Sequence, residues 1–169
     1  YEQALGDAHR AAYFAQSPAT AWNTAGTIFQ GLDRIADARA AFIKATRAEP
    51  APFAWSNLCY LSFVSGDLAQ AAVECGKAIE LDRDDRYARN NLALIHAAQG
   101  DLEKASALFL EAGGEAARHY NMGIVLLALK DYRAAARAFE TALRLDPTMT
   151  NAHFRARDAR LRARGETAK

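Results

Sequence analysis

The sequence predicts an all-helical protein built from stacked helical hairpins. Alanine recurs at a nearly constant interval along the chain, in each case with a second alanine seven positions later. The four alanine pairs are Ala38 and Ala45, Ala71 and Ala78, Ala105 and Ala112, and Ala135 and Ala142. An interval of about 34 residues is typical of repeated hairpins, which build binding surfaces and seldom carry chemistry.

Turn residues divide each unit into two helices. Gly66 can adopt the left-handed conformation that ends a helix, and Asp67 can cap the helix that follows. The third unit repeats this pair, whereas the fourth has Lys130 before its aspartate. We therefore expect a tight turn at each of these positions.

Small residues indicate where the helices approach closely. Gly26 and Gly123 on the first helices are expected to face Ala38 and Ala135 on the second helices. The phenylalanines that follow, Phe42, Phe109 and Phe139, are expected to fill the space between neighbouring units. Larger side chains at the alanine positions would overpack the contact at a cost of about 1–3 kcal/mol each.

The full pattern resembles the tetratricopeptide repeat family. The four units read Trp22, Gly26, Ala38, Phe42, Ala45 and Pro50; Trp55, Cys59, Ala71, Cys75 and Ala78; Arg89, Ala93, Ala105, Phe109 and Ala112; and His119, Gly123, Ala135, Phe139, Ala142 and Pro147. The second unit departs from the family pattern, because Arg83 replaces the proline. The resemblance covers about residues 19–147 and implies a right-handed superhelix, an α-solenoid of antiparallel hairpins.

This resemblance predicts one domain over residues 1–169. Its parts are an N-terminal helix (1–17), repeat 1 (19–51), repeat 2 (52–85), a shortened repeat 3 (86–115), repeat 4 (116–149) and a C-terminal capping helix (150–169). Repeat 3 is four residues short, about one helical turn, and we expect its second helix to end at Gly113. Ser17 and Pro18 are expected to begin the first helix of repeat 1 as its cap and first residue.

The terminal helix is rich in arginine. Alanines spaced by three or four residues form the face expected to pack onto repeat 4: Ala152, Ala156, Ala159 and Ala163. The arginines on the other face are interpreted first as the polar surface of a solenoid cap. A docking site for an acidic partner is the alternative.

Composition limits the function. The chain has 169 residues, is 51% hydrophobic and has a formal net charge of +1. No apolar run approaches the roughly 18 residues that a membrane-spanning helix needs, so no membrane span is predicted. The near-neutral charge disfavours nucleic acid as the partner. The chain begins at Tyr1, and we interpret it as a processed or trimmed fragment that could lack a signal or anchor. We expect a bacterial protein of the cytoplasm or periplasm.

Neither a catalytic nor a metal site is predicted. No histidine lies at helical spacing from another histidine or from a cysteine, and no phosphate-binding loop, nucleophile or dinucleotide motif occurs. We therefore expect no enzyme activity, cofactor or metal. Cys59 and Cys75 face each other across one hairpin, and we expect buried reduced thiols rather than the alternative, a disulfide.

Ligand-binding residues are implied by the family register. One position on the concave side reads Thr24, Asn57, Asn91 and Asn121. The resemblance implies that these amides bind the backbone of an extended peptide; the alternative is that they brace neighbouring helices. The surrounding residues expected to contribute are Phe53, Tyr60, Tyr87, Asn90, Tyr120 and Arg155. The lysines of the family's carboxylate clamp are absent, which disfavours a receptor for chaperone tails.

The predicted function is that of an adaptor. It would bind an extended peptide or a partner helix in the concave groove. A bacterial assembly scaffold, similar to the tetratricopeptide lipoproteins of pilus and secretion systems, is the alternative, acting through its convex face or ends. A third class, an enzyme, would require a catalytic domain outside this chain. The expected partner is a protein or peptide, with weak self-association as a further option.

Overall fold

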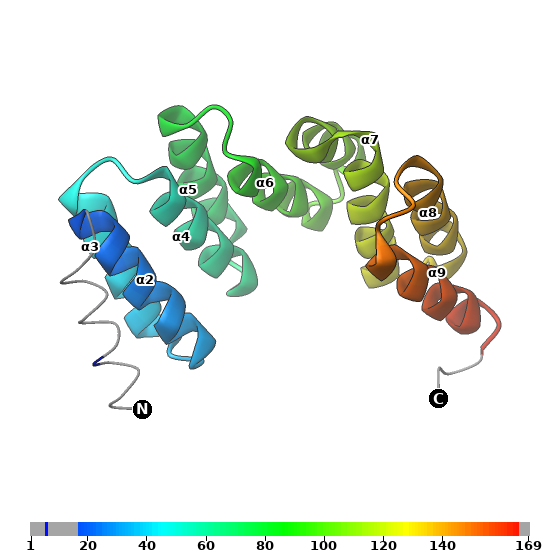
Figure 1. Cartoon of the computed structure of the whole chain (residues 1–169), viewed down its shortest axis with the longest axis horizontal. Coiled ribbons are helices and arrows are strands. Elements are labelled where there is room, and N and C mark those ends of the chain that lie inside the picture. Colours follow the sequence, from blue (N-terminus) through cyan, green and yellow to red (C-terminus); the bar gives the residue numbers. More distant parts are fainter. Residues whose placement is uncertain (1–5, 7–16, 166–169) are drawn as a thin grey trace. The chain divides into compact units, whose positions relative to one another are not determined.

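The computed structural model describes Gly6 and residues 17–165, and this part of the chain is helical, without strands (Figure 1). Its helices are α2 (Pro18–Gly31), α3 (Ile35–Ala48), α4 (Pro52–Val64), α5 (Leu68–Leu81), α6 (Arg86–Ala98), α7 (Leu102–Ala128), α8 (Tyr132–Leu145) and α9 (Thr150–Ala163). Apart from Gly6 and Ser17, the predicted leading helix (1–17) lies outside the described residues. In the described ranges, no helix combines the length and apolarity that a membrane crossing requires.

The chain divides into two compact units, one ending at Asn91 and the other beginning at Leu92. In the first unit, α2 packs against α3 and α4 packs against α5, and α3 also contacts α4. In the second unit, α8 packs against both α7 and α9. These pairings are those of consecutive helical hairpins.

The predicted turns are confirmed. Asp67, Asp101 and Asp131 precede α5, α7 and α8, and each carboxylate accepts a hydrogen bond from the backbone N–H three residues later. Gly66 has a φ of 82°, the left-handed conformation expected of it. Lys130 adopts a similar φ of 61°. The turn geometry is therefore kept even though lysine, unlike glycine, rarely adopts a left-handed conformation.

Glycine allows close packing inside the hairpins. A Cβ atom on Gly26 would lie 2.4 Å from the Phe42 ring, and one on Gly123 would lie 2.7 Å from the Phe139 ring. Each of these two phenylalanines therefore covers the glycine of its own hairpin, whereas the sequence pattern predicts that it fills the space between neighbouring units. Phe42 does both, because it also belongs to the buried cluster that contains Leu58.

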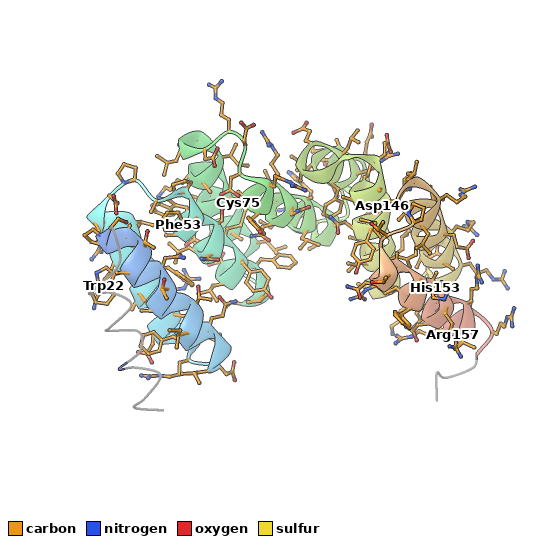
Figure 2. The ribbon with its side chains drawn as sticks, in the orientation of Figure 1. Trp22, Phe53, Cys75, Asp146, His153 and Arg157 are labelled. Atoms are coloured by element: carbon orange, nitrogen blue, oxygen red, sulfur yellow. A yellow bond between two sulfur atoms is a disulfide. The ribbon has the colours of Figure 1, made fainter. Side chains whose placement is uncertain are left out.

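The two cysteines form a disulfide, and the prediction of reduced thiols was wrong. Sγ of Cys59 on α4 lies 2.06 Å from Sγ of Cys75 on α5, and the two Cα atoms are 5.2 Å apart (Figure 2). Both residues are fully buried. The repeat pattern placed the cysteines opposite each other, but their separation depends on how closely this hairpin packs. That separation falls within the range that a disulfide spans.

The shortened joint is a break within α7. The span Leu102–Ala128 consists of two helical segments that meet at a kink, where Gly114 has a φ of 77° and a ψ of −175°. The predicted stop at Gly113 was therefore wrong by one residue. Both positions are glycine and the local sequence does not distinguish them.

Three of the four alanines predicted to pack onto repeat 4 do so, whereas Ala163 is half-buried and lies outside the buried cluster. Ala152, Ala156 and Ala159 on α9 are buried in one cluster with Ala136 and Phe139 on α8. Short side chains on α9 allow this approach, as they do within the hairpins. The alanine face of α9 thus covers the last hairpin.

A buried polar cluster joins the first two hairpins. Glu74 on α5 is almost fully buried and accepts hydrogen bonds from Ser62 Oγ at 2.5 Å and Gln70 Nε2 at 2.9 Å. Arg39 on α3 lies 3.2 Å from the Glu74 carboxylate and also donates to Ser62 at 2.7 Å. The buried Glu74 carboxylate is therefore paired with a cation and also hydrogen-bonded, which offsets the cost of burying its charge.

Candidate functional site

A groove of about 700 Å³ lies in the first unit, between α4, α6 and the loop that connects α5 to α6. Its lining residues are Pro52, Phe53, Ser56, Asn57, Tyr60, Asp82, Asp84, Asp85, Arg86, Tyr87 and Asn91. Five residues expected to bind a ligand thus share one surface: Phe53, Asn57, Tyr60, Tyr87 and Asn91.

Exposed aromatic side chains line this groove. Tyr87 is 79% exposed, and Phe53 and Tyr60 are each 40% exposed. Figure 2 shows Phe53 on α4, one of the two helices that form the groove. Large aromatic side chains gathered at a concave surface are typical of interaction sites.

Asp85 organises one end of the groove. Its Oδ1 atom accepts hydrogen bonds from the backbone N–H groups of Tyr87 and Ala88, both at 2.9 Å, and so caps α6. Its Oδ2 atom accepts a hydrogen bond of 2.5 Å from Ser56 Oγ on α4. The cap of α6 is thereby fixed to the preceding repeat.

The asparagines in this unit connect neighbouring repeats. Nδ2 of Asn57 donates to Oδ1 of Asn23 at 2.8 Å, and Nδ2 of Asn91 donates to the Ser56 carbonyl at 3.2 Å. Both contacts correspond to the alternative role of these asparagines, in which their side chains brace neighbouring helices. An amide has two N–H donors and an acceptor oxygen, and each of these bonds uses one donor. Bracing therefore leaves the amide with further hydrogen-bonding capacity.

Other predicted site residues lie outside the groove lining. Thr24 on α2 donates through Oγ1 to the Thr20 carbonyl of its own helix. Tyr120 and Arg155 belong to the second unit, where Arg155 Nε donates to the Tyr120 hydroxyl at 3.0 Å. Asn90 on α6 and Asn121 on α7 are also absent from the lining.

The residues on the loop side of the groove were not predicted from the sequence. Asp82, Asp84, Asp85 and Arg86 were not singled out, and neither was Ser56. The sequence feature that could have indicated these residues is the charged run from Asp82 to Arg86, in the turn between two repeats. A charge run in a turn usually indicates solvent exposure, so only the fold identifies its contact with α4.

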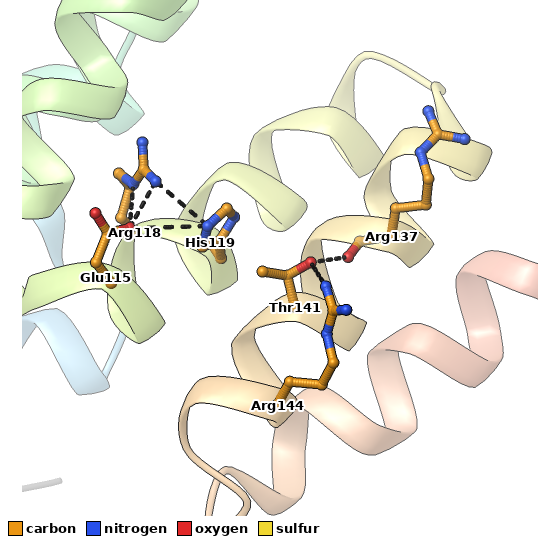
Figure 3. A network of polar contacts seen from close by, with 6 residues as sticks. All are labelled: Glu115, Arg118, His119, Arg137, Thr141 and Arg144. Atoms are coloured by element: carbon orange, nitrogen blue, oxygen red, sulfur yellow. Dashed lines mark hydrogen bonds and ion pairs between the residues drawn. The ribbon is translucent and has the colours of Figure 1, made fainter.

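A second polar network occupies the second unit (Figure 3). Arg118 contacts the Glu115 carboxylate at 2.6 Å, and His119 Nε2 lies 3.8 Å from the same carboxylate. Burial lowers the pKa of the His119 imidazole below 6.5, and the positive charge of Arg118 lowers it further, against the opposing effect of Glu115. The neutral imidazole is therefore favoured in the folded protein.

Among the described residues, no group of three or more His, Cys, Asp or Glu side chains is placed to hold a metal ion. The features of the groove are instead aromatic faces, amides and charges. This combination suits the recognition of a polypeptide.

The described helices thus define an α-solenoid of helical hairpins. Family models described as Tetratricopeptide repeat match residues 23–81, 63–118 and 116–149, which is most of the chain. The chain belongs to the tetratricopeptide repeat family. Repeats of this class are protein-interaction scaffolds, so protein or peptide partners are implied for this chain.

Solved structures share the fold. A thermophilic tetratricopeptide repeat protein of Thermus thermophilus has a TM-score of 0.74 at 16% identity, over 93% of this chain and 89% of its own. PilF of Pseudomonas aeruginosa has a TM-score of 0.67 at 21% identity, over 87% and 69%. YrrB, described as having an unusual peptide-binding site, has a TM-score of 0.60 at 24% identity, over 90% and 81%. No curated protein matches the sequence significantly.

Proposed function

We propose that the groove between α4 and α6 binds an extended peptide segment of a partner protein. The observation that carries this proposal is the presence of Phe53, Tyr60 and Tyr87, all exposed, around one groove that also contains two asparagines. Aromatic surfaces supply apolar contact area at low entropic cost, and amides bind a peptide backbone.

Hydrogen bonds between α4 and α6 hold the groove in a fixed shape before a ligand binds. The bond from Ser56 to Asp85 connects α4 to the start of α6, and the bond from Asn91 to the Ser56 carbonyl connects α4 to the middle of α6. A binding surface fixed before the ligand arrives loses less conformational entropy on association. In this proposal the asparagines brace the repeats and offer their remaining hydrogen-bonding positions to the ligand.

Charge favours a particular class of peptide. The lining contains three aspartates and one arginine, and Asp82 and Asp85 each already accept hydrogen bonds. Asp82 and Asp84 are exposed at the loop, close in sequence to the exposed ring of Tyr87. Lysine or arginine side chains of a ligand would gain from the aspartates and from the aromatic faces. We therefore expect selected peptides to combine basic and apolar residues.

The experiment is selection of 12-residue peptides from a random library against the full chain. Affinities of the selected peptides are then compared for Tyr87→Ala and Phe154→Ala. Phe154 is the control, because it is an aromatic residue 66% exposed on the second unit, outside the groove. Tyr87→Ala should weaken binding by about 1–3 kcal/mol and Phe154→Ala should change it little.

A photo-crosslinker at position 60 should label the selected peptide. If Tyr87→Ala and Phe154→Ala weaken binding equally, or if the label at position 60 captures nothing, the groove is not the site. The other predicted contacts, Thr24, Asn90, Asn121, Tyr120 and Arg155, are tested by alanine substitutions with the same peptides.

The assembly-scaffold function is the alternative. YrrB is described as peptide-binding, and its likeness to this chain is a likeness of fold. The likeness of PilF to this chain is also a likeness of fold. A scaffold of large subunits would retain its partner after Tyr87→Ala, whereas a peptide receptor would not.

A further inference from the structure

A second depression lies in the second unit, between α8 and α9. Its volume is about 290 Å³, and its lining is Arg133, Ala136, Arg137, Arg160, Ala163 and Arg164. The four arginines surround two alanines. Small side chains at the centre leave room that the long arginine side chains at the edge can enclose. We call this feature the arginine depression.

Charge is distributed unevenly along the chain. Residues 132–164 contain eight arginines and three acidic residues, whereas the whole chain has a net charge of +1. The rest of the chain is therefore net negative. The arginine depression lies within the strongly positive segment, and the groove of the first unit contains more acidic than basic residues.

Folding alone does not account for this cluster. Arg133 and Arg137 are four residues apart on α8, and Arg160 and Arg164 are four apart at the end of α9. Like charges at this spacing destabilise a helix slightly, and the depression brings the two pairs together. The cluster therefore has an electrostatic cost that a bound anion would relieve.

The pairing of these arginines is incomplete within the described residues. Arg160 contacts the Glu140 carboxylate, with Nε at 2.7 Å. No carboxylate among the residues that the structure describes forms an ion pair with Arg133, Arg137 or Arg164. Figure 3 shows the guanidinium of Arg137 pointing away from Thr141 and Arg144, the neighbours drawn on the same helix.

We propose that the arginine depression binds an acidic segment of a partner protein, with Asp or Glu carboxylates seated between α8 and α9. A guanidinium donates two parallel hydrogen bonds to a carboxylate, which gives arginine an advantage over lysine for this ligand. All four cations here are arginine. The site lies on the other unit from the peptide groove and has the opposite charge, so it stands independently of the proposed function.

The size of the depression favours a protein segment over a flat anionic surface. A volume of about 290 Å³ in an open hollow between two helices matches one or two side chains. Buried alanine at position 136 lies beneath them. A flat anionic lipid surface attracts basic side chains through its charge, and this attraction does not require a hollow between the helices.

The test uses a fluorescent 12-residue peptide of alternating Glu and Gly, and the same peptide with Gln in place of Glu, each with the full chain. The Glu peptide should bind and the Gln peptide should not. Arg137→Gln combined with Arg164→Gln should weaken binding by about tenfold or more, because two charge-assisted contacts are lost. Arg47→Gln combined with Arg157→Gln is the matched control, because it removes the same charge from exposed residues outside the depression.

A second variant separates shape from charge. Ala163→Met fills the depression and leaves every charge in place, so it should also weaken binding of the Glu peptide. Far-ultraviolet circular dichroism checks that each variant remains helical. The Arg137→Gln and Arg164→Gln variant should be at least as stable as the wild type, since repulsion is removed.

Three results would overturn the proposal. Equal loss of affinity in the cluster variant and the matched control would indicate attraction by overall charge. Binding to mixed vesicles of phosphatidylserine and phosphatidylcholine, with the Glu peptide unbound, would indicate a membrane ligand. Salt-sensitive self-association in sedimentation, abolished by Arg137→Gln with Arg164→Gln, would assign the depression to a second copy of this chain.

Discussion

The Ser56 hydroxyl donates a hydrogen bond of 2.5 Å to the Asp85 carboxylate, which also caps α6. Asp85 is 9% exposed, and Ser56 is 4% exposed. One carboxylate therefore ends a loop, begins a helix and holds that helix to the preceding repeat. The groove of the first unit depends on this contact, because its lining includes both residues.

Replacing Asp85 should loosen the groove. Asp85→Ala removes the cap of α6 and the acceptor of Ser56, and should lower the free energy of unfolding by about 0.5–2 kcal/mol. Asp84→Ala, in the same loop and exposed, should change it by less than about 0.5 kcal/mol. Urea unfolding of the two variants provides the comparison. Equal stability would mean that Asp85 is not a structural cap.

Glycine at position 26 should be required for packing. Gly26→Ala places a Cβ atom 2.4 Å from the Phe42 ring, so the ring must move. We expect a loss of about 1–3 kcal/mol. Gly76→Ala is the control, because its Cβ would meet nothing within 4 Å on helix α5. That substitution should stabilise by about 0.5–1 kcal/mol, so the two variants should shift the melting temperature in opposite directions.

The disulfide should stabilise the second hairpin. It joins residues 16 positions apart, and its loss is expected to cost about 2–4 kcal/mol. The Cys59→Ala and Cys75→Ala double variant should melt at a lower temperature than the oxidised protein.

Reductant should lower the melting temperature of the wild type and leave that of the double variant unchanged. Thiol titration of the oxidised protein in denaturant should detect no free thiol. Two free thiols in protein prepared without reductant would contradict the disulfide.

Arg39 should stabilise the buried Glu74 carboxylate. Arg39→Met leaves that carboxylate with fewer partners, and should cost about 1–3 kcal/mol. Arg47→Met, an exposed residue of the same helix, should cost less than about 0.5 kcal/mol. The Arg39→Met and Glu74→Met double variant should lose less than the sum of its single variants, because the unpaired charge is also removed. Additive losses in chemical denaturation would argue against coupling.

Stability should fall in mild acid because of His119. Its pKa in the folded protein is lowered from 6.5 by burial and by Arg118, so the unfolded chain binds a proton more readily. Stability is therefore fully present above pH 6.5 and decreases as the pH falls below it. The drop in free energy of unfolding between pH 7.5 and pH 5 should be smaller in His119→Gln than in the wild type. An identical pH dependence in the two proteins would exclude this role.

The hairpins of this protein, and the residues at which its helices begin, can be predicted from the sequence. Alanine spacing predicts the hairpins, and aspartates before α5, α7 and α8 predict where helices begin. These features depend on residues within one or two turns of each other, so spacing and residue type are enough to identify them. The alanine face of α9 follows from the same reasoning. The asparagines and aromatics that line the groove were implied by the family resemblance instead.

Contacts between side chains on different helices were decided by the tertiary structure. The bond between Cys59 and Cys75 required a Cα separation that the repeat pattern does not fix. Ser56 and Asp85 are 29 residues apart, and Asn57 contacts Asn23 across 34 residues. The stagger between the packed helices and the distance between them determine which of these side chains form contacts. Sequence therefore determined the hairpins and their class, while packing determined which polar side chains meet and how the groove is built.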